Sequence, residues 1–149
     1  PFGKYILVTT EKGISDISFY TEPELDAIMA MEKEVLKRNK HVVFQRVNRE
    51  GVDFNAKQKL DPQGTPFQLE VWKTLLKIKK GQTKTYAQVA EMMGQPNSAR
   101  AVASAIAKNN IAVLIPCHRV IRNDGLAGEF RWGPVLKKQL LTSEGLKIR

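Results

Sequence analysis

Residues 85–108 read TYAQVAEMMGQPNSARAVASAIAK, and this stretch contains two short helical patterns separated by a turn. Its first four residues have the spacing of a capping box, which predicts that the first helix begins at Tyr86. The tetrapeptide Gly-Gln-Pro-Asn at 94–97 predicts a tight turn, with asparagine or serine capping a second helix over about 98–108. Two short helices joined by such a turn predict a helix-turn-helix.

The second predicted helix has two contrasting faces. Ala99, Val102 and Ile106 recur at helical spacing and are expected to face the core. Arg100 and Ser104 lie on roughly the opposite side, and the residues around Arg100 are small, so a large partner could approach this face closely. Such a face suits insertion into a DNA groove. The alternative is an alanine-rich helix that packs on its own protein, with Arg100 merely solvated.

The helical pattern extends upstream to Thr65. Residues 65–68 form another capping box, with proline at the first helical position. An apolar stripe follows at helical spacing and is expected to end at Gly81; it consists of Phe67, Val71, Leu75 and Ile78. From Thr65 onward we therefore predict a mainly helical region.

The first sixty residues have a different pattern. Residues 4–9 and 14–20 are rich in β-formers and flank a short turn, which predicts a hairpin. An amphipathic helix is expected over about 22–38, and a third strand over 42–47. Residues 48–64 are polar and turn-rich and predict a linker. This part of the chain is therefore expected to form a small α/β domain.

Charge divides the chain at the same place. Residues 1–64 hold ten basic and ten acidic residues, whereas residues 65–149 hold fourteen basic and five acidic ones and carry the whole net charge of +9. We place an N-terminal α/β domain with its linker over 1–62 and a C-terminal domain over 63–149. The basic half favours a polyanionic partner, above all nucleic acid. The alternative is a lysine-rich face that serves only solubility.

Composition excludes several classes of protein. The 149 residues are 42% hydrophobic and 26% charged, as in soluble globular proteins, and no apolar run approaches the ~20 residues of a membrane helix. The single cysteine excludes an intramolecular disulfide and indicates a reducing, intracellular location. With only His41 and His118 beside it, four nitrogen or sulfur ligands for structural zinc cannot be assembled, so we expect no metal. The start at Pro1 indicates processing, or excision from a longer chain.

The cysteine has an unusual setting. An apolar run at 111–115 predicts a buried strand that delivers Cys117 to a fixed point, and His118 follows directly. A sulfur is a strong nucleophile only as a thiolate, which needs a base or a cation nearby, so the Cys-His pair indicates covalent chemistry. The alternative is that Cys117 is a small buried hydrophobe, as most free cysteines are.

Residues 116–120, Pro-Cys-His-Arg-Val, closely resemble the active-site signature of the O6-alkylguanine-DNA alkyltransferases, also called methylated-DNA–protein-cysteine methyltransferases. Segments 64–72, 81–86 and 99–102 resemble the first C-terminal helix and the helix-turn-helix of that family. Further positions agree at family spacing: Asn109, Gly125, Gly128, Trp132, Gly133, Glu144 and Gly145. The resemblance spans about residues 61–147.

The resemblance implies an α/β (α+β) architecture in two parts. The N-terminal domain is expected to be ribonuclease-H-like, with a reduced sheet and without nuclease chemistry. The C-terminal domain is expected to be mainly helical, with a winged-helix-like helix-turn-helix. The implied function is direct-reversal DNA repair, in which a methyl or other alkyl group passes from O6 of guanine, with O4 of thymine as a second candidate, to the protein's own cysteine. Each molecule would act once, and no cofactor is implied.

The implied partner is double-stranded DNA that contains O6-alkylguanine, bound by a monomer in the cytoplasm or nucleoid, or in the nucleus of a eukaryote. The recognition helix would enter the minor groove, with Ala101 and Ser104 against the DNA. Arg100 would fill the space left by the base rotated out of the stack. Tyr86 would press on the target phosphate and help to turn the nucleotide outward.

For the reaction, the resemblance implies that Cys117 is the nucleophile and that His118 takes its proton through a water. Glu144 would orient the imidazole, as carboxylates do in catalytic triads. Asn109 would fix the loop before the cysteine by bonding its backbone, and Tyr86 would protonate the departing guanine. Each could instead be a core or solvated residue, so the assignment depends on their agreement at family spacing.

The implied pocket for the flipped base consists of Tyr86, Ile106, Val120, Phe130, Arg131 and Trp132. Backbone carbonyls at Cys117 and Val120 would accept from the exocyclic amine of guanine. Phe130 stands where the family often has tyrosine, so it keeps the ring face for stacking and loses a hydroxyl donor. Backbone amides at 130–132, or Tyr86, would then supply the hydrogen bond to O6.

Arg119, inside the signature, is expected to be structural. It would tie the loop to an acidic group of the N-terminal part, with Asp16 and Asp53 as candidate partners.

Two other functions remain open. A DNA-binding module with a silent site would share the basic helix-turn-helix, although relatives of that kind lack the cysteine. A Cys-His hydrolase such as a peptidase would use the same pair of side chains. It would leave the helix-turn-helix unexplained, and no oxyanion-hole loop is recognisable.

Overall fold

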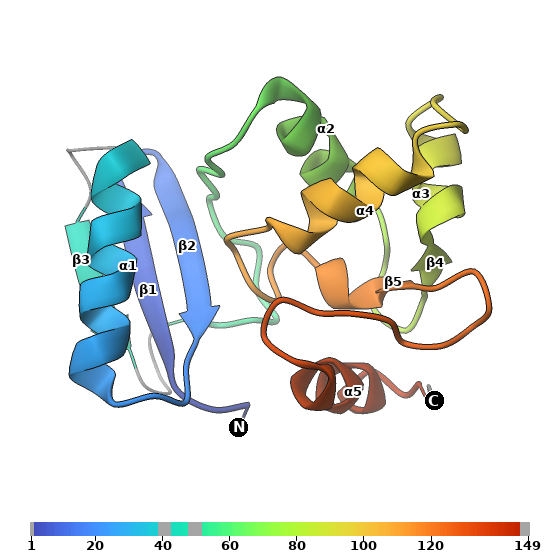
Figure 1. Cartoon of the computed structure of the whole chain (residues 1–149). Coiled ribbons are helices and arrows are strands. Elements are labelled where there is room, and N and C mark those ends of the chain that lie inside the picture. Colours follow the sequence, from blue (N-terminus) through green and yellow to red (C-terminus); the bar gives the residue numbers. More distant parts are fainter. Residues whose placement is uncertain (1, 39–42, 48–51, 147–149) are drawn as a thin grey trace. The chain divides into compact units, whose positions relative to one another are not determined.

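The computed structural model describes residues 2–38, 43–47 and 52–146. Their architecture is mixed α/β, with five α-helices and two small sheets among these residues (Figure 1). His41, position 42 of the third predicted strand and position 147 of the family resemblance lie outside the described residues.

The chain divides into two compact units. The first comprises residues 3–63 together with residues 110–112. The second is formed mainly by residues 64–109 and by those from 113 onward. Cys117 and the helix-turn-helix both belong to the second unit.

The first unit is a three-stranded antiparallel sheet with one helix. β1 (Tyr5–Thr10) pairs with β2 (Gly13–Phe19) on one side and with β3 (Val43–Val47) on the other. α1 (Glu24–Arg38) packs on one face of this sheet. The core between helix and sheet contains Ile6, Val8, Ala27, Met31 and Val35. The predicted hairpin, helix and third strand are confirmed.

The segment predicted as a linker is partly held to β2. The backbone N–H of Ile14 donates to the carbonyl of Lys59 at 2.9 Å, and its carbonyl accepts from Asp61 at 2.7 Å. Gly13 has a φ of +145°, and a Cβ there would lie 2.5 Å from the Lys59 carbonyl oxygen. Only glycine fits this close approach of two backbones.

A short segment after the helix-turn-helix also pairs with β2. Ile17 donates its N–H to the carbonyl of Asn110 at 2.9 Å and accepts from the N–H of Ala112 at 3.0 Å. The strand predicted over 111–115 is nevertheless wrong. Val113 adopts a φ of +69°, a left-handed conformation that a strand cannot contain, and the backbone turns there.

The second unit is built on four helices. They are α2 (Pro66–Leu75), α3 (Tyr86–Met92), α4 (Ala99–Ala107) and α5 (Pro134–Ser143). Both predicted capping boxes are present at the starts of α2 and α3. α4 packs against α2 and α3, so the predicted helix-turn-helix is confirmed (Figure 1).

The predicted end of α2 is wrong. The helix stops at Leu75 instead of continuing to Gly81. The N–H groups of Lys77 and Ile78 each bond to the carbonyl three residues earlier, at 3.0 Å, which tightens the chain into a turn. Ile78 is still 1% exposed and fills the core from this turn. The apolar stripe therefore extends beyond the end of α2, because Ile78 packs into the core from the turn after the helix.

A two-stranded parallel sheet was not predicted. β4 (Lys84–Thr85) pairs with β5 (Val120–Ile121), in the register Lys84 with Val120 and Thr85 with Ile121. Thr85 is also the N-cap of α3. The sheet therefore connects the start of α3, where Tyr86 lies, to the segment that follows the cysteine.

Candidate active site

Cys117 begins a single 3₁₀-helical turn, η1 (Cys117–Arg119), that runs directly into β5. Its backbone N–H donates to the carbonyl of Ile115 at 2.7 Å, which fixes the chain direction just before the thiol. Cys117 is 3% exposed, and it lines a cavity of the second unit. The sulfur is thus shielded from the general surface and can be reached from that cavity.

The amide of Asn109 contacts the thiol directly. Its Nδ2 lies 3.2 Å from Sγ of Cys117 and 3.2 Å from the carbonyl oxygen of Ile115. Asn109 is fully buried, at 0% exposure. The predicted bond to the loop backbone is present, whereas the bond to sulfur was not predicted. A donor at this distance stabilises the thiolate relative to the thiol.

Glu144 lies just after α5 and joins two residues of η1. Nε2 of His118 is 3.1 Å from Oε2 of Glu144. Arg119 contacts both carboxylate oxygens, with Nε 2.9 Å from Oε1 and Nη2 2.8 Å from Oε2, and donates Nη1 to the carbonyl of Ile78 at 2.8 Å. The three side chains form one largely buried charged cluster.

The expected partners of Arg119 were wrong. Its carboxylate partner is Glu144, because η1 places the guanidinium at the C-terminal end of α5. Asp16 is bonded to Arg38 at 2.6 Å inside the first unit. Asp53 accepts from the backbone N–H of Asn55 in its own turn.

The charge state of the cluster determines the tautomer of His118. Burial alone would raise the pKa of Glu144, but the bonds from His118 and Arg119 lower that pKa to about 2. Burial also lowers the pKa of His118 against the pull of Glu144, so the imidazole is neutral at pH 7. An ionised carboxylate can only accept, so Nε2 carries the hydrogen and Nδ1 carries the lone pair. Nδ1 is buried and has no hydrogen-bond partner among the described residues.

Cys117 itself is a thiol at rest. Burial raises its pKa to about 11, although the Asn109 amide and the charges of Lys137 and Arg131 act in the opposite direction. Its proton must therefore leave before or while the sulfur attacks a substrate. The free lone pair of His118, on the neighbouring residue, is a suitable acceptor.

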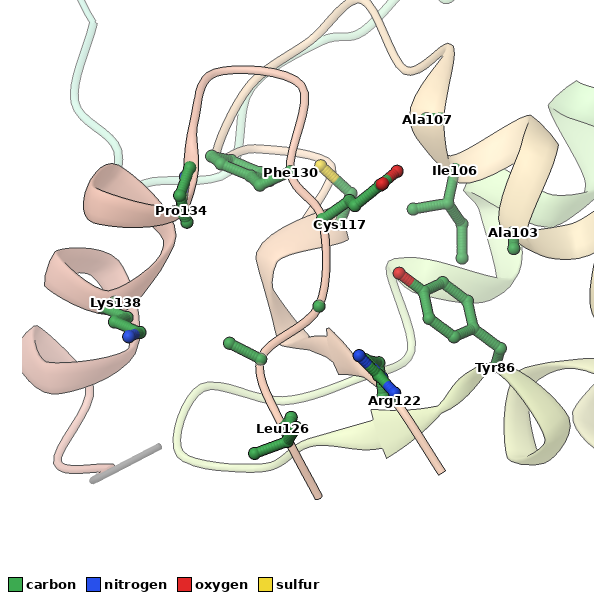
Figure 2. Close-up of a pocket in the computed structure, with 13 residues that line it drawn as sticks. Tyr86, Ala103, Ile106, Ala107, Cys117, Arg122, Leu126, Phe130, Pro134 and Lys138 are labelled. Carbon is green, nitrogen blue, oxygen red and sulfur yellow. The ribbon is translucent and has the colours of Figure 1, made fainter. Parts of the chain in front are cut away.

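The cavity beside the thiol has a volume of about 650 Å³. In Figure 2, Cys117 lies between Tyr86, Ile106 and Ala103 on one side and Phe130 and Pro134 on the other. The remaining lining residues are Ala107, Arg122, Leu126, Ala127, Gly128, Glu129 and Lys138. This volume lies within the range of about 300–1,000 Å³ that is usual for small-molecule sites.

Half of the residues predicted for the pocket line this cavity, namely Tyr86, Ile106 and Phe130. The other three lie outside its lining. Val120 is fully buried, and its carbonyl accepts from Nζ of Lys137 at 2.7 Å. Arg131 and Trp132 contact each other, with the guanidinium 5.4 Å from the centre of the indole ring.

Tyr86 is the first residue of α3, and its hydroxyl approaches the loop after β5. A Cβ on Gly128, where φ is +76°, would lie 3.6 Å from this hydroxyl and 2.9 Å from Cγ of Arg122. Burial raises the pKa of Tyr86, and the charges of Cys117 and Glu129 act in the same direction. Tyr86 is therefore a neutral phenol at pH 7 and can donate a proton into the cavity.

α4 presents different faces to the core and to solvent. Val102 and Ala105 are buried in the core of the second unit, where Trp72 donates Nε1 to the Ala105 carbonyl at 2.9 Å. The residues predicted to contact DNA are all exposed, namely Arg100, Ala101 and Ser104. Ile106 is buried and also lines the cavity, so one helix contributes to both the exposed face and the cavity wall.

Comparison with known proteins identifies the family. A family model described as the DNA-binding domain of 6-O-methylguanine DNA methyltransferase matches residues 66–146. The methylated-DNA–protein-cysteine methyltransferase of Methanosarcina barkeri is 36% identical over 154 residues, which cover 100% of this chain and 95% of that protein. The chain belongs to the methylated-DNA–protein-cysteine methyltransferase family.

Other members of the methyltransferase family match over different lengths. The methylated-DNA–protein-cysteine methyltransferase of Kluyveromyces lactis is 53% identical over 81 residues, covering 54% of this chain and 43% of that protein. The chain spans less than half the length of several curated relatives that it matches. The crystal structure of Mycobacterium tuberculosis OGT in complex with DNA has a TM-score of 0.67 and 26% identity, covering 93% of this chain and 85% of that one.

One buried residue beside the candidate site was not predicted from the sequence. Lys137 of α5 is 1% exposed, and its Nζ donates to the carbonyls of Val120 at 2.7 Å and Glu129 at 3.1 Å. Burial lowers its pKa to about 8, while the charge of Cys117 acts in the opposite direction. Position 137 shares a helical stripe with Leu140 and Leu141, so a lysine at a core position was the available signal.

No group of three or more His, Cys, Asp or Glu side chains within the described ranges could hold a metal ion. Across the same ranges, no helix has the length and apolar composition needed to cross a bilayer.

Proposed function

We propose that this protein repairs DNA by transferring an alkyl group from O6 of guanine to Cys117, with O4 of thymine as a second candidate position. The observation that carries this proposal is the thiol on the wall of a 650 Å³ cavity, next to a histidine whose Nδ1 lone pair is free. A buried hydrophobic cysteine would need neither feature. Membership of the methyltransferase family supports the same conclusion.

The transfer is an in-line displacement at carbon. As the proton of Cys117 passes to Nδ1 of His118 through a water, a lone pair of Sγ forms the new S–C bond. The C–O6 bond breaks, and its electron pair stays on the guanine. Tyr86 donates its phenolic proton to the purine, which therefore leaves neutral. The imidazolium and the phenolate then exchange protons with solvent, and the thioether that remains cannot react again.

The cluster around Glu144 prepares His118 for this step. The ionised carboxylate holds the hydrogen on Nε2, so that Nδ1 remains a base, and it stabilises the imidazolium once the proton arrives. Arg119 keeps Glu144 ionised and oriented through two bonds. Asn109 and Lys137 favour the developing thiolate, because both lower the pKa of Cys117.

Duplex DNA is the proposed partner, and α4 is the proposed recognition helix. Ala101 and Ser104 are small and exposed, so α4 could approach the floor of a minor groove that is only about 6 Å wide. Arg100 would occupy the position of the extruded base. Tyr86 would help to turn the nucleotide outward from the start of α3. The excess of positive charge in this half of the chain supports phosphate contacts.

Within the cavity, Phe130 would stack on the flipped guanine through its ring face. The carbonyls of Cys117 and Val120 would accept from the exocyclic amine; the Val120 oxygen retains a lone pair beside its bond to Lys137. Backbone N–H groups at 130–132 would supply the hydrogen bond to O6; of these three residues, Phe130 lines the cavity.

The finer architecture is also part of the proposal. The order β2-β1-β3 with one covering helix is compatible with a reduced ribonuclease-H-like fold for the first unit. The pairing of β4 with β5 beside the helix-turn-helix is compatible with a winged-helix-like second unit. We propose domains over 1–62 and 63–149, and an intracellular monomer that acts on DNA.

One incubation distinguishes repair from its rivals. The protein is mixed with a duplex that contains O6-methylguanine, and its intact mass is then measured by mass spectrometry. A gain of about 14 Da that maps to Cys117, and that is absent in Cys117→Ser, supports alkyl transfer. Tight binding without a mass change would indicate a DNA-binding module with a silent site. If neither occurs, the repair assignment fails and a Cys-His hydrolase becomes the better hypothesis.

A further inference from the structure

Arg131 lies in a short segment that forms one wall of the cavity. We call residues 128–133, between β5 and α5, the wall segment. Phe130 of this segment lines the cavity, and its carbonyl accepts from the N–H of Gly133 at 3.0 Å, which closes a tight turn. The turn places Arg131 and Trp132 at its tip.

The guanidinium of Arg131 bonds to Asn109, the residue whose amide contacts the thiol, and we call this bond the tie. Nη1 of Arg131 donates to the backbone carbonyl of Asn109 at 2.9 Å. Asn109 follows the C-cap of α4, where backbone carbonyls carry partial negative charge and favour a cation. The side-chain amide of Asn109 meanwhile bonds to Sγ of Cys117. One residue thus bonds to the nucleophile through its side chain and to the wall segment through its backbone.

Two aromatic contacts connect the tie to the cavity. The guanidinium of Arg131 lies 5.4 Å from the centre of the Trp132 ring, within cation–π range. Trp132 in turn meets Phe130 edge to face, with ring centres 5.3 Å apart. Trp132 does not line the cavity, so its ring contacts Phe130 from outside the cavity lining. A continuous series of contacts therefore runs from Asn109 through Arg131 and Trp132 to Phe130.

From these contacts we infer that Arg131 is a positioning residue. It fastens the wall segment to Asn109 and so holds the stacking face of Phe130 at a fixed position relative to the thiol. The inference rests on the proposed function, because the wall would be needed to hold a flipped purine. It also connects the end of α4, the proposed recognition helix, to the cavity. A lysine is not equivalent to Arg131, because its point charge lacks the planar group that can stack and bond at once.

The test compares Arg131→Ala and Arg131→Lys with wild type. Single-turnover alkyl transfer is measured with free O6-methylguanine base, so that changes in DNA binding do not enter. We expect Arg131→Ala to react about tenfold more slowly, the effect of losing one charge-assisted hydrogen bond. Arg131→Lys should recover only part of the rate. Lys79→Ala, which removes an equal charge from the exposed turn after α2, should react like wild type.

Tryptophan fluorescence tests the tie independently of the reaction. The chain has two tryptophans, and Trp72 is 1% exposed, so increased quenching by acrylamide reports mainly on Trp132. Arg131→Ala should increase quenching, and Lys79→Ala should not. Thermal melts confirm that each variant is folded at the assay temperature. A purely structural role would lower the melting temperature without slowing the folded protein.

The outcomes separate this inference from the proposed function. If wild type methylates Cys117 while Arg131→Ala matches it in both rate and quenching, the inference is overturned and the function stands. If wild type does not methylate Cys117, the proposed function fails. The quenching comparison still tests the tie in that case, and unchanged quenching in Arg131→Ala would overturn it.

Discussion

Arg119 and Glu144 form a two-point ion pair, in which two nitrogens of the guanidinium meet the two oxygens of the carboxylate at 2.9 and 2.8 Å. His118 bonds to the same carboxylate through Oε2. The arginine therefore orients the group that determines which ring nitrogen of His118 carries hydrogen. Arg119, which follows the proposed catalytic pair, is therefore bonded to Glu144 in the second unit, whereas an acidic partner in the first unit was expected.

Glu144→Gln should abolish most alkyl transfer. An amide can donate to Nε2 of His118, which would move the ring hydrogen to Nδ1 and remove the base. We expect a loss of about 100-fold or more, the usual scale of general-base catalysis, in single-turnover experiments with free O6-methylguanine. Glu91→Gln, at an exposed position of α3, is the control for charge. A rate within threefold of wild type would mean that Glu144 does not set the tautomer.

The rate should remain high at pH values where an ordinary histidine is already protonated. Because burial lowers the pKa of His118 below 6.5, the imidazole stays neutral as the pH falls through that value. Its capacity as a base is lost only at lower pH, when Nδ1 takes up a proton. We expect the rate of transfer from the free base to fall as the pH is lowered, and the midpoint of this decline should lie below pH 6.5. A midpoint at or above 6.5 would contradict the buried, neutral histidine.

Lys137→Met should weaken the nucleophile and the fold together. The substitution removes a cation that favours ionisation of Cys117, so the pKa of the thiol should rise further. Iodoacetamide should then react more slowly with Cys117 at pH 7, where Lys137 is mostly protonated, by about tenfold for each pKa unit.

The same substitution leaves the carbonyls of Val120 and Glu129 without a donor, which should lower the free energy of unfolding by about 1–3 kcal/mol for each unsatisfied group. Lys73→Met, at an exposed position of α2, is the matched control and should change neither quantity. An unaltered thiol reactivity in Lys137→Met would show that its charge does not reach the sulfur.

Arg100→Ala should separate base extrusion from chemistry. The residue is exposed on α4 and does not line the cavity, so its loss should leave transfer from free O6-methylguanine unchanged. Transfer from duplex DNA should fall by about 100-fold, because holding a base outside the stack requires a few kcal/mol. Lys108→Ala removes a charge from the end of the same helix and should weaken binding without this selectivity. Equal losses of Arg100→Ala on both substrates would exclude a part in extrusion.

Local patterns predicted the parts of the fold whose causes are local. The capping boxes at Thr65 and Thr85 and the apolar period of α1 correctly located their helices, because caps and helical periods act within one or two turns. The run at 111–115 failed, because apolar character alone cannot distinguish a strand from a buried turn. The backbone of Val113 is left-handed, directly after the residue whose N–H bonds to Ile17 of β2.

In the candidate site, too, local features could be predicted from the sequence and contacts between distant residues could not. The cysteine, the histidine and their family resemblance could be recognised as a continuous motif. The partner of Arg119 could not, since ion pairs depend on which elements meet in space. The tie from Arg131 to Asn109 joins positions 22 residues apart, and nothing in the local pattern of either residue indicates it. Lys137 was visible as a charge on an apolar stripe, but its hydrogen-bond partners are carbonyls of β5 and of the segment after it, which the stripe does not indicate.

The path of residues 110–112 has a consequence for how the molecule loses its structure. These three residues belong to the first unit, although they lie between α4 and the cysteine in the second. Melting of β2 would release Ile111 and Ala112, which are 1% and 0% exposed, and the released segment is bonded covalently to Asn109. Local melting of the N-terminal sheet would therefore free the backbone next to Asn109, the residue whose amide bonds to Sγ of Cys117.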